Sequence, residues 1–191
     1  MTRSAKMLTA LAVLAGCSGQ TAASRVNASD GNAPPVVQGL SAAIQHDVAV
    51  LRAVTAPFHD FDQARAAGWS AQITPCMTDP GGAGGMGFHY GKVKLIDGSV
   101  HVDQPQLLLF EPEQNGRLRL VAAEYIIPYT FVPRSAAPPV LFGQEFQQVD
   151  AFQLWGLHVW AWKNNPSGLF APWNPVVTCA NATAQVSMSH K

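Results

Sequence analysis

The spacing of apolar residues changes once along this sequence, and that change most constrains the fold. Within residues 40–53, apolar side chains recur at every third or fourth position, which predicts an amphipathic helix. Beyond Pro75 the period becomes two, and residues 87–95 and 118–126 alternate as strands with one buried face do. A helix followed by strands predicts an α+β fold: a curved antiparallel sheet with the N-terminal amphipathic helix packed on one face.

Turn signals set the order of the predicted strands. Residues 106–110 are apolar, residues 113–116 read Glu-Gln-Asn-Gly, and residues 117–127 follow as the second arm of a hairpin. Residues 128–151 are proline-rich and predict a long irregular connection to a last strand at 154–163. In the second arm of the hairpin, period two places these side chains on one face: Leu118, Leu120, Ala122, Glu124 and Ile126.

The first residues resemble a bacterial lipoprotein signal peptide. Arg3 and Lys6 precede the apolar residues 7–15, and a small-residue cleavage site ends in Cys17. This resemblance implies that residues 1–16 are removed and that Cys17 carries lipid and fatty acyl chains such as palmitate, which anchor the protein to a membrane. The alternative is an ordinary secretory signal with a chance cysteine.

The same resemblance predicts where the protein is located. Ser18 follows the cysteine, at the position where lipoproteins retained in the inner membrane carry aspartate. We therefore expect a lipid-anchored protein of the bacterial cell envelope. In a cell with two membranes, it would lie on the outer membrane and face the periplasm.

Composition divides the remaining chain and excludes one class of partner. Residues 17–38 are rich in small and polar residues and predict a lipidated flexible tether, followed by one globular domain at 39–179 and a polar tail at 180–191. The chain has 12 basic and 12 acidic residues and no cluster of Lys or Arg. This balance removes the electrostatic attraction on which nucleic-acid binding depends, so we expect no nucleic-acid partner.

The three cysteines fit an exported protein. With Cys17 assigned to the lipid, Cys76 and Cys179 remain, and the oxidising envelope favours a disulfide between them. A metal-binding pair or two free thiols is the alternative, although the two residues lack the close spacing typical of metal sites.

Three ionisable residues fall on the apolar faces of three predicted strands: His89, Glu124 and His158. A buried carboxylate needs a cation, a metal or a hydrogen-bond donor, or it must keep its proton. Two imidazoles and one carboxylate match the ligand set of several divalent-metal sites and could also serve as general acid and base. The alternative is a hydrogen-bond network that only stabilises the sheet.

Aromatic residues are concentrated near the end of the chain. Period two places Trp160 and Trp162 on the same face as His158, and Tyr90 follows His89, so these three are candidates for ligand contact. Core packing is the alternative for large aromatic side chains. The segment 155–173 could instead form a contact surface for another protein.

Residues 81–87 are glycine-rich and contain the spacing G-x-G-x-x-G. Dinucleotide binding requires a strand before this motif and a helix after it, whereas here a loop precedes it and a strand follows. We therefore reject that function. The glycines predict a close approach of the backbone to a ligand or to another segment, or a mobile loop beside His89.

Four segments resemble a family of uncharacterised exported bacterial proteins. They are residues 85–90 (GMGFHY), 107–112 (LLLFEP), 120–125 (LVAAEY) and 157–168 (LHVWAWKNNPSG). The resemblance extends to residues 61–69 and 174–179, so it covers most of the domain, and it implies no named activity.

These observations together predict a membrane-anchored envelope protein. We expect it to bind a small-molecule ligand or a divalent metal, the candidate cofactor, through His89, Glu124 and His158, in a pocket over the sheet. An enzyme that uses the same residues is the alternative, and a non-catalytic interaction protein is the third class.

Overall fold

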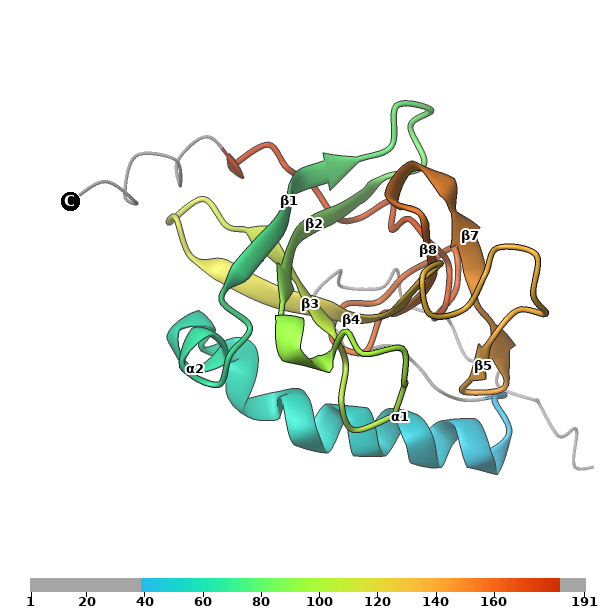
Figure 1. Cartoon of the computed structure of the whole chain (residues 1–191). Helices are drawn as coiled ribbons and strands as arrows, with labels where there is room; N and C mark the ends of the chain where they lie inside the picture. The colour runs from blue at the N-terminus through green and yellow to red at the C-terminus, as the bar shows by residue number, and fades with distance from the viewer. Residues whose placement is uncertain (1–38, 183–191) are drawn as a thin grey trace, which may run out of the picture.

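The computed structural model describes residues 39–182, and the predicted signal peptide, the whole tether with Cys17 and most of the tail lie outside this range. A curled six-stranded antiparallel sheet has the order β1-β2-β3-β4-β8-β7, and helix α1 (Ala42–Thr55) lies along one side of it (Figure 1). The strands are β1 (Ala71–Thr78), β2 (Gly85–Gly91), β3 (Leu107–Pro112), β4 (Leu118–Pro128), β7 (Gln147–Val149) and β8 (Leu154–Val159). A two-stranded ribbon, β5 (Val140–Leu141) and β6 (Gln144–Glu145), lies in the proline-rich connection. The predicted α+β fold is confirmed.

The N-terminal helix forms where the apolar spacing predicts it. Ser41 caps α1 by accepting a hydrogen bond from the amide of Ile44, and the helix tightens at Pro57 into a 3-10 turn, Ala56–His59. A short helix, α2 (Phe61–Ala66), follows, capped by the side chain of Asp60. It ends before Gly68, which adopts a positive φ of 108°.

Two apolar clusters lie on the two faces of the sheet. On the helix face, Val48 and Leu51 pack against strand residues that include Phe110, Tyr125 and Trp155. The opposite face, called here the inner face, carries the second cluster: Leu107, Leu109, Val121, Ala122, Ile126, Trp160 and Val177. Both faces of the central strands are therefore buried.

A β-bulge in β4 corrects one prediction about the faces of this strand. Leu109 pairs with Ala122 and the next residue, Phe110, pairs with Leu120, so Val121 is an extra residue in β4. Because of this extra residue, Leu118 and Leu120 lie on the helix face, whereas Ala122, Glu124 and Ile126 lie on the inner face. The prediction that all five share one face is wrong for the first two.

The last strand ends at Val159 rather than at residue 163. The amide of Trp160 donates to Leu169, and the amides of Trp162 and Lys163 both donate to the carbonyl of Val121 in the bulge. The chain therefore leaves the sheet and turns. Trp162 joins the helix-face cluster and its indole donates to Thr55 Oγ1 at 3.0 Å, so the prediction that it shares a face with His158 is wrong.

A disulfide links β1 to the C-terminal segment, as predicted. Cys76 and Cys179 are 103 positions apart, and the C-terminal segment runs back beside β1 and β2 (Figure 1). A disulfide of this kind is consistent with an extracytoplasmic protein. Among residues 39–182 there is no helix long and apolar enough to cross a membrane.

The glycine-rich segment packs closely against another segment of the chain. Gly85 and Asn174 exchange backbone hydrogen bonds, and a Cβ at Gly84 would lie 2.2 Å from the carbonyl oxygen of Asn174. Gly87 has a positive φ of 84°, and a Cβ there would lie 2.4 Å from the carbonyl oxygen of Phe110. Of the alternatives predicted for these glycines, backbone packing explains both residues.

Removing the disulfide should destabilise the domain substantially. A cross-link between residues 103 positions apart restricts the unfolded chain, and the double variant Cys76→Ser/Cys179→Ser should lose about 4 to 5 kcal/mol of unfolding free energy in the chain-entropy model. Urea denaturation of the two proteins measures this loss. Reductant should lower the wild-type midpoint to that of the variant and leave the variant unaffected, and equal midpoints for the two oxidised proteins would contradict the prediction.

Candidate metal centre

The side chains of His89, Glu124 and His158 meet on the inner face of the sheet. The distance from His89 Nε2 to Glu124 Oε2 is 3.4 Å, and from His158 Nε2 to Glu124 Oε1 it is 3.6 Å. One ligand atom from each residue lies within 4.8 Å of the other two. Each carboxylate oxygen thus faces a different imidazole.

Strand register and sheet curvature bring these residues together. Glu124 on β4 pairs directly with His158 on β8, whereas His89 lies on β2, with β3 between it and β4. Strands three positions apart are separated by about 14 Å in a flat sheet. The two imidazole ring centroids are only 6.1 Å apart, which is possible because the sheet curls toward its inner face.

Burial controls the charge of all three groups. Their exposed fractions are 4% for His89, 6% for Glu124 and 8% for His158. Removal from water raises the pKa of Glu124 to about 8 and lowers the pKa of His158 to about 4. The pKa of His89 falls to about 3, because of burial and then because of repulsion from His158. At neutral pH the site therefore consists of a largely protonated carboxyl group and two neutral imidazoles.

The hydrogen bonds of the three side chains are incomplete. His89 Nδ1 lies 2.8 Å from the hydroxyl oxygen of Thr74 on β1. His158 Nε2 is buried and has no hydrogen-bond partner, the one such side-chain atom in the described part of the chain. A buried polar atom without a partner is unfavourable by about 1 to 3 kcal/mol, so this nitrogen calls for an explanation.

The immediate surroundings are apolar and tightly packed. Trp160 lies beside His158 with nearly parallel rings and a centroid distance of 6.4 Å, and its indole donates to Ala171 O at 2.7 Å. Gly156 precedes His158 by two residues, and a Cβ there would lie 3.2 Å from Glu124 Oε1. The absence of a side chain at position 156 therefore leaves space for the Glu124 carboxyl group beside β8.

The predicted ligand contacts are divided between the two faces. Trp160 lies on the inner face, next to the three ionisable residues. Tyr90 packs against Phe61 and Phe110 on the helix face, and Trp162 lies on that face too. Neither Tyr90 nor Trp162 therefore contacts the three residues, because alternation on β2 and the end of β8 turn them away.

Sequence patterns missed one polar partner of this site and a second buried polar feature elsewhere in the domain. Sequence spacing does not distinguish Thr74, because the pairing of β1 with β2 is irregular and the apolar residues of β1 do not alternate regularly. Lys163 and Glu111 form a buried ion pair at 2.6 Å, and the second oxygen of Glu111 accepts from the amide of Thr178. In the sequence, the feature that could have indicated this pair is the glutamate that follows the apolar residues 107–110.

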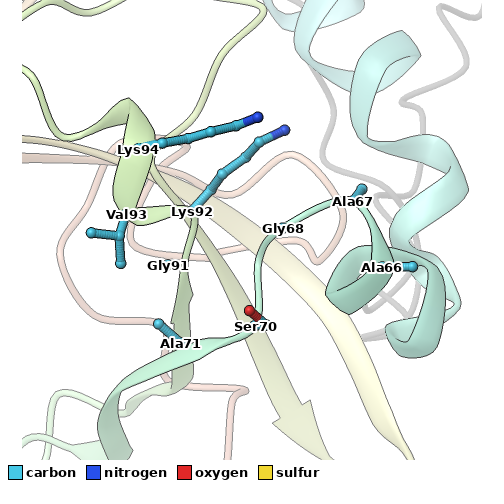
Figure 2. A pocket seen from close by; sticks show the side chains of 9 residues that line it. All are labelled: Ala66, Ala67, Gly68, Ser70, Ala71, Gly91, Lys92, Val93 and Lys94. Atoms are coloured by element: carbon cyan, nitrogen blue, oxygen red, sulfur yellow. The ribbon is translucent and has the colours of Figure 1, made fainter.

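A separate pocket of about 390 Å³ lies away from the three residues. It is formed between the end of α2, the start of β1 and the end of β2, and the side chains of Lys92 and Lys94 extend over it (Figure 2). The Lys92 ammonium lies 4.2 Å from the centre of the Trp69 ring. This open, mostly small-residue pocket contains none of the predicted site residues.

Comparisons with protein-family models, curated proteins and solved structures find no match to this chain. The resemblance of its segments to exported bacterial proteins therefore stays a prediction. The chemical case for the site depends on its own geometry.

The donor set fits a divalent transition metal. Two imidazole nitrogens and one carboxylate are ligands of catalytic zinc sites and of non-haem iron sites. An ion between them would occupy His158 Nε2, the buried nitrogen without a partner, and would favour the charged form of Glu124. The same residues without an ion form a neutral network in which one nitrogen is unsatisfied.

The variant Glu124→Gln should stabilise the metal-free protein at neutral pH. The unfolded carboxyl loses its proton above its ordinary pKa of 4.5, whereas the buried one keeps it up to about pH 8. The contribution of Glu124 to stability therefore falls as pH rises between these values, by about 1.4 kcal/mol per unit. The lowered pKa values of His89 and His158 act in the opposite direction below about pH 6.5, equally in wild type and variant, so the prediction concerns the difference between the two proteins. Glutamine removes the contribution of Glu124, so the variant should gain on the order of 3 kcal/mol at pH 7, measured by urea unfolding with a chelator at pH 5 to 8.

Glu111→Gln is the matched control, because Glu111 is also a buried glutamate in the same sheet but is paired with Lys163. Its substitution leaves a buried ammonium without its partner and should destabilise the protein by about 3 to 5 kcal/mol. Opposite signs for the two variants are the expected result. A loss of stability in Glu124→Gln that does not vary with pH would refute the assignment of a protonated carboxyl.

Proposed function

We propose that this chain is a lipid-anchored protein of the bacterial cell envelope that binds a divalent metal ion through His89, Glu124 and His158. One observation carries the proposal: three ligand atoms from three strands lie within 4.8 Å of one another in a buried site. The orphan His158 Nε2 supports it, since a structural hydrogen-bond network would be expected to satisfy that atom.

The contrast with Glu111 gives further support. That carboxylate is as buried as Glu124, yet it is satisfied by the Lys163 ammonium and the Thr178 amide. Glu124 faces only two imidazoles and has no permanent cation among the ion pairs of the described residues. The chain thus stabilises one buried glutamate with its own lysine and leaves the other for an external cation.

An enzyme is the second candidate, and the number of ligands favours it. Three protein ligands leave at least one position open on a four-coordinate ion, as in catalytic zinc sites, whereas structural zinc sites use four. The apolar inner face around Trp160 would limit that position to water or a small substrate. A small-molecule ligand bound without metal is the remaining alternative.

The location in the envelope rests on the N-terminal sequence and the disulfide. Residues 1–17 have the form of a lipoprotein signal peptide, and the Cys76–Cys179 bond is typical of oxidising compartments. The domain begins near residue 39, so about 20 residues would separate it from a lipid on Cys17.

Metal analysis tests the binding site directly. Protein purified without chelator, incubated with Zn²⁺, Fe²⁺ or Mn²⁺ and then dialysed should hold about one ion per chain. His89→Ala/His158→Ala should lose it, because two of three ligands are gone, whereas His46→Ala/His101→Ala, which changes two exposed histidines, should bind as wild type does. Equal, negligible metal in all three proteins would leave a structural network as the better explanation.

Substitution of Cys17 tests the anchor. Wild-type protein expressed with its signal should partition into the detergent phase of Triton X-114 and be recovered with membranes. Cys17→Ser removes the lipidated thiol, so mass spectrometry of the purified variant should find no acyl chain, whereas wild type should carry the added mass of its lipid at Cys17. Ser18→Ala, which leaves the cysteine in place, is the control and should be acylated, and a wild-type N-terminus without lipid would contradict the anchor.

A further inference from the structure

We propose that Thr74 is the positioning residue of this centre, which holds the His89 ring so that Nε2 faces Glu124 and the metal. This inference rests on the proposed metal-binding function. The observation behind it is the distance of 2.8 Å between Thr74 Oγ1 and His89 Nδ1, the ring nitrogen turned away from Glu124.

The position of Thr74 in its strand is unusual. β1 is an edge strand of the six-stranded sheet, and Thr74 is its one buried residue, with 7% of its surface exposed. A single inward position on an edge strand would favour an apolar side chain for packing alone. Here it carries a hydroxyl, which forms a hydrogen bond with His89.

The chemistry of imidazole explains why this hydrogen bond matters for metal binding. A neutral ring has one proton on its two nitrogens, so a ring that binds metal through Nε2 must carry the proton on Nδ1. That buried N–H then needs an acceptor, and Thr74 Oγ1 is a side-chain oxygen 2.8 Å from Nδ1, beside a backbone hydrogen bond between the ring and Gly87. An acceptor in this place fixes both the tautomer and the orientation of the ligand.

Two features fix Thr74 against His89. The two residues are paired in the β1–β2 ladder, with register irregularities on both sides of the pair. Two residues further along β1, Cys76 is linked to Cys179 in the segment that contributes Val177 to the inner-face cluster. The edge strand β1 is therefore fixed by its pairing with β2 and by the disulfide at Cys76.

The test compares Thr74→Val with Thr74→Ser in the full chain, purified in detergent and titrated with Zn²⁺. Valine keeps the branched shape but removes the acceptor, so Zn²⁺ affinity should fall by about 10- to 100-fold. Serine restores the hydroxyl and should bind within about threefold of wild type. Thr78→Val, the same change at an exposed position of β1, should have no effect and controls for the strand itself.

A second readout does not require metal. In metal-free protein labelled with ¹⁵N-histidine, the Nδ1 and Nε2 signals of His89 report the ring tautomer and its hydrogen bonds. Thr74→Val should shift these signals, and Thr74→Ser and Thr78→Val should leave them close to those of wild type. A structural role in packing alone would change unfolding stability without moving the ring signals.

The two readouts separate this inference from the proposed function. If wild type binds Zn²⁺ and Thr74→Val binds it with the same affinity, the role of Thr74 is overturned and the metal site stands. Absence of Zn²⁺ binding by the wild type would overturn the metal site. In that case the ring signals still decide whether Thr74 orients His89, and unchanged signals in Thr74→Val would overturn this as well.

Discussion

The structure depends on how a curled sheet accommodates three ionisable groups removed from water. A carboxyl and two imidazoles share a space bounded by leucine, isoleucine and tryptophan side chains, where charged forms are disfavoured. The pKa shifts follow from this: Glu124 keeps its proton to about pH 8, and both histidines stay neutral well below their ordinary range. A divalent ion would reverse the balance by supplying the positive charge that the surrounding residues lack.

Other features of the fold position the residues of the inner face. Curvature brings His89 within reach of Glu124 across β3, and the bulge at Val121 separates Glu124, on the inner face, from Leu118 and Leu120 on the helix face. The backbone carbonyl of Val121 in the bulge also accepts hydrogen bonds from the amides of Trp162 and Lys163, where the chain turns after β8. Helix α1 covers only the opposite face, through Val48 and Leu51, so it stabilises the sheet without contributing to the site.

The two buried glutamates show how similar residues can differ in role. Glu111 forms an ion pair that ties β3 to Lys163 and to the C-terminal segment, and it has all its partners within the chain. Glu124 has two weakly basic neighbours and a nearby nitrogen with no partner. Burial alone therefore does not distinguish these two carboxyl groups; the number and charge of their partners does.

The sequence by itself determined the elements and the identity of the three clustered residues. Apolar spacing placed the helix and the main strands, and the predicted pairing of Cys76 with Cys179 is confirmed. Local spacing suffices for these features because they depend on the period of one segment and on the redox compartment. It also placed Glu124 on the same face as Ala122 and Ile126, beyond the bulge.

Only the tertiary structure decided which faces and neighbours these residues have. One extra residue at Val121 moved Leu118 and Leu120 to the helix face, and the early end of β8 turned Trp162 away from His158. Thr74 became a partner of His89 through an irregular edge pairing that no period records. Register slips, sheet curvature and strand ends arise from contacts between segments far apart in the chain, so the spacing within any one segment cannot specify them.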